Sequence, residues 1–300
     1  MQDEIALIPL SFIKIHHLND FFDFIESKMK SLIENHPHIK LFLFPEYGSL
    51  SLNALFPNDL NQVKECNRKL LTLIPEFRKF FLECARKYRV YILAPSIPYF
   101  ENHRYVNRAF FYSPDGKEDY QDKVMMTRFE DEEWGIQSGG ELLKIFATSI
   151  GKVSILTCFD IEFPQHSLAL SCENVDLILV PSCTDSFAGM ERVHRGAKAR
   201  AQELQTQVAV VQTIKDALWN PAVDSNIGQS AIYLIPDTST ELNRHFEIQL
   251  PINSNEVLIY KLDNEFHRKL RDSSNVYLLK NIQKHASVLS SLYKIEHVNF

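Results

Sequence analysis

The chain of 300 residues carries 32 Lys and Arg against 38 Asp and Glu, which gives a formal net charge of −6. This length is typical of one large or two medium domains, and a hydrophobic content of 45% is enough to bury a sizeable core. The acidic balance argues against nucleic acid as a partner, and totals of 9 Gly and 13 Pro exclude a collagenous or disordered chain.

The first residues, the apolar runs and the cysteines bear on the compartment of the protein. MQDEIALIPLSF has no basic segment ahead of an apolar one, so we expect no signal peptide. The longest apolar runs fall well short of the roughly 20 residues that cross a bilayer. The chain has 5 cysteines and no CxxC motif, which favours free thiols in a reducing environment. The sequence therefore predicts a cytoplasmic protein without membrane contact.

Short apolar runs alternate with longer amphipathic segments along the whole chain. Strands are predicted at 5–10, 39–44, 90–96, 108–113, 152–158, 175–182, 207–213, 230–236 and 256–262, and helices at 17–35, 61–87, 165–173, 190–206 and near 280–295. Pro75 is expected to kink or split the second helix, and SPDG (113–116) predicts a hairpin turn. The interleaved elements predict an α/β fold with a mixed sheet, and the lack of a linker predicts one main domain.

Several well-known catalytic signatures are absent. The sequence has no GxSxG, no HExxH and no GxxxxGK[ST] motif. His36 and His38 flank Pro37 in a predicted loop, without a thiol or carboxylate nearby that would complete a metal site. We therefore expect no metal site at these histidines.

Three side chains with reactive groups follow predicted strands. Glu46 comes after IKLFLFP, Lys123 after the extended segment EDYQD, and Cys158 ends KVSILTC. Each alone has an ordinary interpretation, as an exposed carboxylate, a surface lysine or a small core residue. Sites in open α/β sheets form at the carboxyl ends of strands, however. Because an acid, an amine and a thiol all fall at such ends, we predict that they share one site.

Cys158 stands at a predicted strand-to-helix turn, with Pro164 at the first position of the following helix. Backbone N–H groups and a helix N-terminus near a thiol favour the thiolate and lower its pKa. The same N–H groups are suited to hold an oxyanion. Glu46 is then the candidate base, and Lys123 is the candidate cation that stabilises a tetrahedral intermediate.

Six segments, in order, resemble those of the nitrilase superfamily of carbon–nitrogen hydrolases. They are FPEYG (44–48), YQDKVMM (120–126), LTCFDIEFP (156–164), DLILVPS (176–182), AKARAQELQTQVAVVQT (197–213) and GQSAIYLIPDT (228–238). The first three resemble the segments around the family's Glu-Lys-Cys triad, which assigns those roles to Glu46, Lys123 and Cys158. The similarity runs from about residue 4 to about residue 262.

The resemblance implies a four-layer-type α-β-β-α sandwich that hydrolyses a small non-peptide amide through a cysteine thioester. Ammonia or an amine would leave, no metal or cofactor would take part, and the N–H of Phe159 would join Lys123 in binding the oxyanion. We predict that residues 1–270 form the hydrolase domain and that residues 271–300 form a helical extension. That extension is expected to pack on the domain or on a partner subunit.

The sequence also departs from the family pattern or leaves a choice open. Many amidase-like members carry a second glutamate after the lysine; Glu130 matches its spacing best, and Glu132 and Glu133 are close competitors. Asp160 matches the family's aspartate, although a turn or capping role is an equal alternative. Glu162 stands where many members have arginine, which either changes the preferred substrate charge or reflects a solvated side chain.

The substrate pocket is expected to come from variable loops. These are 47–60, 97–107, 127–143 and 184–192, and their aromatic residues are Phe56, Tyr99, Phe100, Phe129, Trp134 and Phe187. The aromatic residues indicate either an enclosed pocket or ordinary packing. The acidic run 130–133 either favours an amine-bearing substrate or is simply solvated.

Other functions remain open on the sequence alone. The spacing from Lys123 to Glu130 also resembles that of acyltransferases, so a soluble N-acyltransferase, an N-carbamoyl hydrolase and a nitrile hydrolase are alternatives within the superfamily. A non-catalytic binding protein that retains the fold is an alternative of another class. His166 and His194 suggest a papain-like Cys–His pair, but the local signature of that family is missing around Cys158.

We also expect a homodimer or a larger homo-oligomer. The apolar residues of the C-terminal segment fit one face of a helix that either folds back or packs on a second subunit: Ile282, Ala286, Val288, Leu289, Leu292 and Ile295. The pairing of subunits in the family favours the second arrangement.

Overall fold

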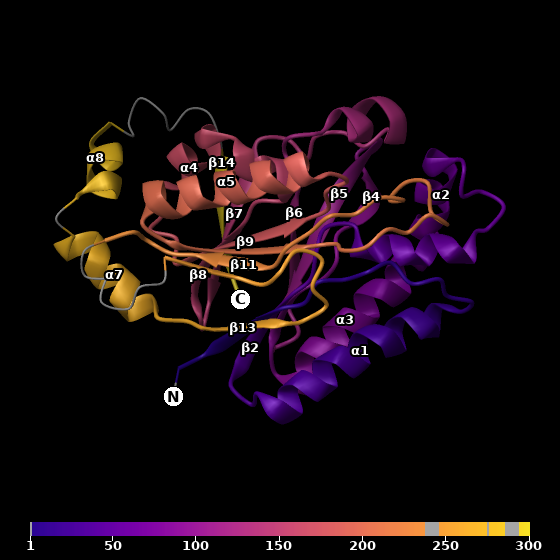
Figure 1. The fold of residues 1–300 in the computed structure, drawn as a ribbon, viewed down its shortest axis with the longest axis horizontal. Helices are drawn as coiled ribbons and strands as arrows, with labels where there is room; N and C mark the ends of the chain where they lie inside the picture. The colour runs from indigo at the N-terminus through magenta and orange to yellow at the C-terminus, as the bar shows by residue number, and fades with distance from the viewer. Residues whose placement is uncertain (1, 238–245, 275, 286–293) are drawn as a thin grey trace.

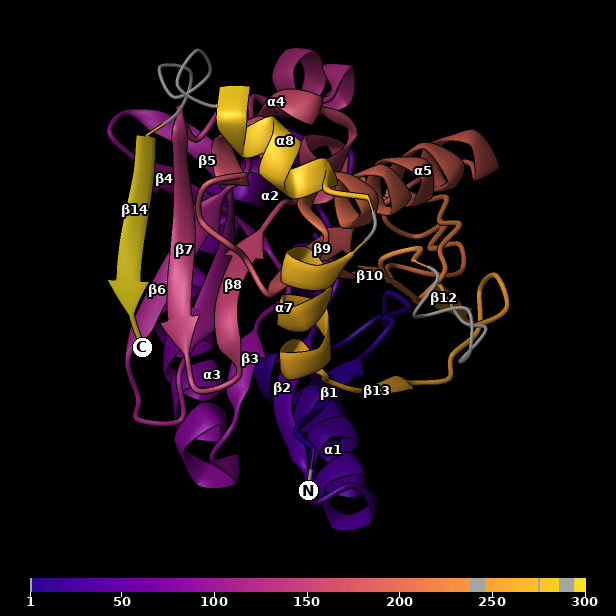
Figure 2. The same cartoon turned by 90° about the vertical axis from the view of Figure 1, so that its left-hand side faces the viewer.

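The computed structural model describes residues 2–237, 246–274, 276–285 and 294–300. Two mixed, seven-stranded sheets lie face to face, and helices cover both outer faces (Figures 1 and 2). This is the predicted α-β-β-α sandwich. It forms because most strands are apolar on both faces, and each sheet therefore needs cover on two sides.

The first sheet is built mainly from the N-terminal part of the chain. Its order is β13 (Leu258–Lys261), β1 (Glu4–Leu7), β2 (Ile39–Leu43), β3 (Tyr91–Leu93), β5 (Arg104–Tyr112) and β4 (Ile97–Glu101), with β6 (Glu118–Asp122) paired to β5. The strands β1, β2 and β3 are parallel, whereas β5 is antiparallel to β3, β4 and β6. The predicted turn at 113–116 closes the β5–β6 hairpin, where Gly116 N–H donates to the Ser113 carbonyl.

The second sheet is built from the rest of the chain. Its order is β12 (Glu247–Gln249), β11 (Ala231–Tyr233), β10 (Gln207–Gln212), β9 (Leu177–Ser182), β8 (Gly151–Ile155), β7 (Leu142–Thr148) and β14 (Lys294–Asn299). The strands β8, β9 and β10 are parallel, so their last residues lie at the same end of the sheet.

The helices form the two outer layers. α1 (Leu18–Asn35), α2 (Val63–Leu70) and α3 (Ile74–Tyr88) lie on the side of the first sheet, and α4 (Pro164–Leu170), α5 (Phe187–Leu204) and α8 (Leu278–His285) lie on that of the second (Figure 1). α7 (Asn264–Ser273) follows β13. The predicted split at Pro75 is confirmed, because α2 and α3 are separate helices and Pro75 lies in the first turn of α3.

The alternation of side chains along each strand divides the core into layers. In β1, Ile5 and Leu7 pack between the two sheets, while Ala6 packs toward α1 and α3. The third apolar layer lies between the second sheet and α4, α5 and α8. Buried strands therefore fix the positions of the loops at their ends, where the candidate site lies.

Strands β4 and β7 were not predicted from the sequence, and each has a physical reason. β4 contains Pro98, which lacks an N–H group and is tolerated because β4 is the last strand in its sheet. β7 contains Lys144 in the middle of its apolar run. Lys144 is nevertheless buried, because its ammonium pairs with Asp119 at 2.6 Å and lies over the Tyr120 ring.

The C-terminal segment differs from the predicted helix near 280–295. α8 ends at His285, residues 286–293 lie outside the described residues, and Lys294–Asn299 form β14, which is parallel to β7. Ile295 therefore belongs to a strand, not to a helix face. The Phe300 ring packs on Phe111 and Phe146 between the sheets, so the described end of the segment lies on its own domain.

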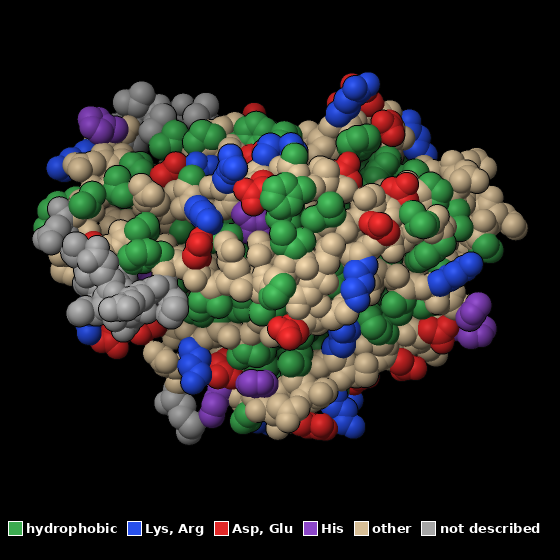
Figure 3. All heavy atoms as spheres, in the orientation of Figure 1, with side chains coloured by type: hydrophobic (Ala, Val, Ile, Leu, Met, Phe, Trp, Pro, Cys, Tyr) green, Lys and Arg blue, Asp and Glu red, His purple; other side chains and the backbone are tan. Residues whose placement is uncertain are grey.

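The surface gives two further observations. On the face seen in Figure 3, acidic and basic side chains are interspersed, without a continuous basic area. Within the described ranges, every helix is too short or too polar to cross a bilayer.

Candidate active site

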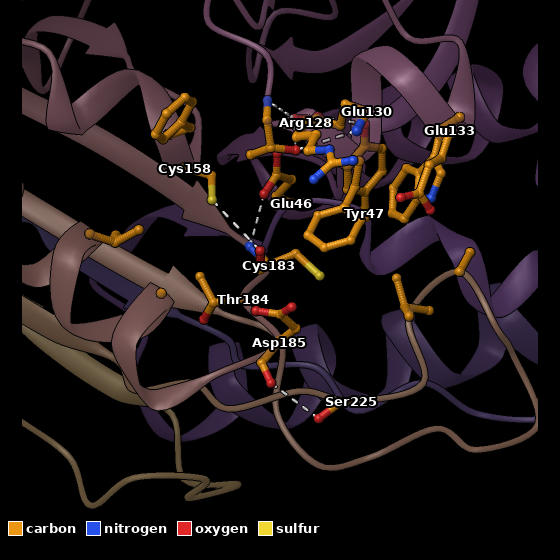
Figure 4. A pocket seen from close by; sticks show the side chains of 18 of the residues that line it. Glu46, Tyr47, Arg128, Glu130, Glu133, Cys158, Cys183, Thr184, Asp185 and Ser225 are labelled. Atoms are coloured by element: carbon orange, nitrogen blue, oxygen red, sulfur yellow. Dashed lines mark hydrogen bonds between the residues drawn. The ribbon is translucent and has the colours of Figure 1, made fainter.

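Glu46, Lys123 and Cys158, the three residues that the sequence places at strand ends, meet at one cavity of about 450 Å³. Glu46 follows β2, Lys123 follows β6, and Cys158 follows β8. A fourth strand, β9, supplies Cys183 to the same cavity (Figure 4). The two sheets thus contribute the candidate base Glu46 and the candidate nucleophile Cys158 from the two inner layers of the sandwich.

Cys158 occupies a sharp turn directly after β8. Its φ of +48° lies in the left-handed region, and it begins the short 3₁₀ helix Cys158–Glu162 that leads into α4 at Pro164. The Cys158 Sγ atom is buried and lies 3.6 Å from the Cys183 carbonyl oxygen. Such a non-glycine residue at positive φ is strained, which indicates that the turn holds the sulfur in a required position.

The protonation state of Cys158 differs from the sequence-based expectation. A turn at a helix N-terminus was expected to lower the thiol pKa. Burial, followed by the neighbouring Glu46 carboxylate, instead raises the pKa of Cys158 well above its usual value. This favours a thiol in the resting state, so a nucleophilic role for Cys158 would require a base that removes its proton.

The turn is held from outside by α5. Arg200 Nη1 donates to the Ile161 carbonyl oxygen at 3.0 Å, and a bidentate ion pair with Glu203 orients the guanidinium. Gly196 lets the helix approach closely, because a methyl group there would lie 2.7 Å from the Ile161 oxygen.

Gly196→Ala is therefore expected to push the nucleophile turn away from α5. We expect a loss of about 1–3 kcal/mol in the free energy of unfolding, typical of overpacking, together with slower alkylation of Cys158. Chemical denaturation and intact-mass spectrometry measure the two effects. Gly189→Ala in the same helix is the control, because its nearest contact would be 3.3 Å from the Ser186 hydroxyl. Equal losses in both variants would contradict the tight approach at Gly196.

Glu46 is a fully enclosed carboxylate with donors on both oxygens. Its Oε1 accepts hydrogen bonds from Lys123 Nζ at 2.9 Å and Asn107 Nδ2 at 2.8 Å, and its Oε2 accepts one from the Cys183 N–H at 2.9 Å. Burial raises the pKa of Glu46 to about 7; the Lys123 charge acts in the opposite direction. A carboxyl group that titrates near neutral pH is suited to accept and return a proton.

Lys123 lies between two buried carboxylates. Its Nζ is 2.9 Å from Glu46 and 2.6 Å from Glu130. Burial works against the ammonium form, but the two carboxylates outweigh it and raise the pKa of Lys123 well above its usual value. The ammonium has three N–H groups, and the described residues provide acceptors for two of them, so one is left for a further acceptor in the cavity.

Glu130 is the member of the acidic run that reaches the buried cluster. Its oxygens accept from Lys123, from the Tyr47 hydroxyl at 2.8 Å and from the Thr127 N–H at 3.0 Å. Burial alone would raise its pKa, but Lys123 and these donors hold the pKa of Glu130 below its usual range. By contrast, Glu132 and Glu133 are exposed, and Glu132 pairs with Arg128.

Phe159 and Asp160 have different environments. Phe159 lines the cavity beside Cys158. Asp160 is buried away from the cavity lining and accepts hydrogen bonds from the N–H groups of Val124, Met125 and Thr157. Burial raises the pKa of Asp160 to about 7. Asp160 thus ties the Lys123 segment to the Cys158 turn, which matches the turn-type alternative for this residue.

Three contacts of the cluster were not predicted from the sequence. Tyr47, at φ +53°, binds Glu130 through its hydroxyl; Asn107, in β5, donates to Glu46; and the main chain of Cys183 contacts both Glu46 and Cys158. In Figure 4 the Cys158 and Glu46 side chains both point toward the main chain of Cys183. Tyr47 directly follows Glu46 in the sequence, and this position was a possible signal for it. Asn107 and Cys183 are far from Glu46 in the sequence, so no local pattern indicated their contacts.

The cavity wall agrees only in part with the predicted loops. Segments 127–134 and 184–192 contribute to it, and so does the unpredicted segment 221–225, but no residue of 97–107 is among the lining residues that the structure describes. Of the predicted aromatic residues, Phe129 and Trp134 line it. Glu162 also lines it, in an ion pair with Arg192 at 3.1 Å.

The mouth of the cavity has an excess of carboxylates. Glu133, Asp185 and Asp224 line it, and the structure gives them no ion-pair partner within its described ranges. The cavity arginines, Arg128 and Arg192, are each paired with a glutamate. A cleft with walls of one sign concentrates ions of the opposite sign.

This charge predicts how small reagents reach Cys158. We expect 2-bromoethylammonium to alkylate Cys158 about tenfold faster than iodoacetate does, after each rate is divided by that with the neutral thiol N-acetylcysteinamide. The ratio should fall as salt is added, since salt screens the exposed carboxylates. Asp185→Asn and Asp224→Asn should also lower it. A ratio near one, unchanged by salt, would contradict a negative cavity mouth.

Within the described residues, no group of three or more His, Cys, Asp or Glu side chains has the arrangement needed to hold a metal ion. The groups near Cys158 are instead suited to proton transfer and oxyanion binding. A thiol, a carboxyl that titrates near neutral pH and an ammonium with one unused N–H surround the same space. This set of groups is suited to nucleophilic attack on a carbonyl carbon.

Comparison with known proteins gives a consistent assignment. The family model for carbon-nitrogen hydrolase matches residues 18–235. "Probable hydrolase YhcX" of Bacillus subtilis (strain 168) is 30% identical over 206 residues, and a deaminated glutathione amidase of Dictyostelium discoideum is 25% identical over 150 residues. The match covers 69% and 50% of this chain, and 40% and 48% of those relatives, so the chain spans less than half the length of each.

Solved structures show the same architecture. The crystal structure of Saccharomyces cerevisiae Nit3, a member of branch 10 of the nitrilase superfamily, superposes with a TM-score of 0.69. The superposition covers 90% of this chain and 93% of that one, at 17% sequence identity. At this identity the similarity establishes the fold.

Proposed function

Since the chain belongs to the carbon–nitrogen hydrolase family, within the nitrilase superfamily, we propose that it hydrolyses a small non-peptide amide through a thioester on Cys158. Glu46 is the general base and acid, and Lys123 and the Phe159 N–H bind the oxyanion. Glu130 holds Lys123 and borders the substrate.

One observation carries this proposal: a thiol, a carboxyl with a pKa near neutrality and an ammonium surround one cavity large enough for a small molecule. The three come from strands of two different sheets, and burying them together costs folding free energy that ordinary packing would avoid. Such a cost is typical of functional sites.

In the first half-reaction Glu46 takes the Cys158 proton as the sulfur attacks the carbonyl carbon. The carbonyl π electrons move to the oxygen, which then accepts from Lys123 and the Phe159 N–H. When the intermediate collapses, the carbon–nitrogen bond breaks and Glu46 gives its proton to the leaving nitrogen. Ammonia or an amine departs, and the acyl group remains on sulfur as a thioester.

In the second half-reaction Glu46 removes a proton from water, and the hydroxide attacks the thioester carbon. The same donors stabilise the second oxyanion. The carbon–sulfur bond then breaks, Glu46 returns its proton to the sulfur, and the carboxylic acid leaves. Glu46 thus acts first as a base and then as an acid in each half-reaction, which requires a pKa close to the working pH.

The experiment that tests the function screens amides, ureides and nitriles for ammonia release, with Cys158→Ala as the blank. A substrate should also leave a mass increase of its acyl group on Cys158 when the reaction is quenched early. Adding a primary amine distinguishes hydrolysis from acyl transfer, since an acyltransferase would form the new amide. Activity that survives in Cys158→Ala would refute the proposal.

The same protein allows a test without substrate. Under limited iodoacetamide, Cys158 should be modified faster than Cys66 and Cys84, the buried thiols whose pKa burial raises to about 11 and about 12. The Glu46→Gln variant should lose this difference. If Cys158 reacts no faster than those two thiols in the wild type, the site has no activated nucleophile.

A further inference from the structure

Asn107 stands behind the candidate triad and contacts each part of its charged cluster. Its Nδ2 donates to Glu46 Oε1 at 2.8 Å and to Glu130 Oε1 at 3.3 Å. Its backbone carbonyl accepts the N–H of Lys123 at 2.9 Å. The residue lies in β5, so the sheet fixes its main chain.

The Asn107 side chain is placed at a cost. It is 1% exposed, and its Oδ1 has no hydrogen-bond partner among the described residues. The opposite orientation of the amide would set Oδ1 against two carboxylates, so the contacts decide which atom is nitrogen. A buried acceptor without a partner is unfavourable. The hydrogen bonds that the Asn107 amide donates to Glu46 and Glu130 must therefore stabilise these carboxylates enough to offset this loss.

Asn107 does not line the cavity among the described residues, and its amide faces only the two carboxylates. Glu46 and Glu130 otherwise share a single cation, Lys123. A neutral donor between them reduces the repulsion without adding a second positive charge. It also fixes the Glu46 oxygen that Lys123 binds, so the other oxygen stays on the Cys183 side, toward Cys158.

We propose that Asn107 is a positioning residue, which keeps Glu46 ionised and aligned so that it can accept the Cys158 proton. The inference rests on the proposed function, because it requires Glu46 to act as the base. Asn107→Leu keeps the approximate size of the side chain and removes both donors. Asn107→Asp keeps the shape, removes at least one donor and adds a third acid.

The test follows the rate of Cys158 alkylation by iodoacetamide from pH 5 to pH 9. In the wild type the rate should rise with pH and level off as the base ionises. In Asn107→Leu the midpoint of this rise should move up by about one pH unit or more, because the lost donor stabilised the ionised form of Glu46. In Asn107→Asp it should move at least as far.

Gln207→Met is the matched control. Gln207 is a fully buried amide with hydrogen bonds to Asn264, Asp176 and Tyr260, at the first residue of β10 and away from the cavity lining. It should lower the melting temperature without moving the midpoint. If both Asn107 variants lower the melting temperature but keep the wild-type midpoint, Asn107 is only structural and the inference is wrong. Failure of the proposed function would give a different result, because Cys158 of the wild type would then react no faster than Cys66.

Discussion

Cys158→Ala, Glu46→Gln and the double variant are all expected to lose activity by about the same factor, 10⁴ or more in kcat/KM. In the proposed mechanism the proton that leaves Cys158 goes to Glu46, so the loss of either group stops the same step, and removing the second adds little. The measurement is the rate of ammonia release on the best amide from the substrate screen.

Cys183→Ala is the matched control for this comparison. Cys183 also lines the cavity with a thiol, but its contacts to Glu46 and Cys158 come from the main chain. We expect its kcat/KM to stay within about tenfold of the wild type. If the losses in the two triad variants multiply in the double variant, Glu46 and Cys158 act in separate steps, and the proposed proton transfer is wrong.

Lys123→Met is expected to have the largest effect on stability. It leaves Glu46 and Glu130 buried and without their cation, and removing one partner from a buried ion pair costs about 3–5 kcal/mol. The variant should also be inactive, because the oxyanion loses its charged donor. Urea unfolding at pH 8 measures the loss in the free energy of unfolding.

The loss should shrink as the pH falls. In the wild type, Lys123 holds the pKa of Glu130 below its usual value. Without the ammonium, burial raises the pKa of the Glu130 carboxyl above its unfolded value, so the folded variant binds more protons than the unfolded chain. Its stability must then decrease as pH rises through the interval between those two values. We expect a clearly smaller deficit at pH 5 than at pH 8.

Lys144→Met provides the control for burial of a lysine. Lys144 is also buried, but its partners Asp119 and Glu296 have side chains that are 21% and 47% exposed. Water can solvate these carboxylates once the ammonium is gone. The loss should therefore be smaller and nearly independent of pH. Equal, pH-independent losses in both lysine variants would contradict the electrostatic explanation for Lys123.

Much of the fold could be predicted because periodic apolar runs report directly on burial. β2, β9 and β10 consist mainly of apolar residues, and the structure covers both faces of each one. The same runs located Glu46 and Cys158, since each follows a strand. Lys123 was placed by its family-like segment as well as by its position after EDYQD.

The remaining features depend on contacts that a local pattern does not contain. Lys144 interrupts an apolar run, and its burial depends on Asp119 from another strand. The polar contacts of Asn107 join β5 to the ends of β2 and β6. The thiol pKa of Cys158 depends on how deeply it is buried, whereas the sequence indicated only the turn. Such features arise from tertiary packing, which a single segment does not determine.

The main chain of Cys183, the residue that follows β9, has a consequence for how this site varies. Its N–H donates a hydrogen bond to Glu46, and its carbonyl oxygen accepts one from the Cys158 thiol. Every residue type except proline has both of these main-chain groups. The side chain at position 183 consequently takes no part in the contacts to Glu46 and Cys158, although it forms part of the cavity surface. We therefore expect substitutions at position 183 to change substrate preference while the main-chain contacts to Glu46 and Cys158 are kept.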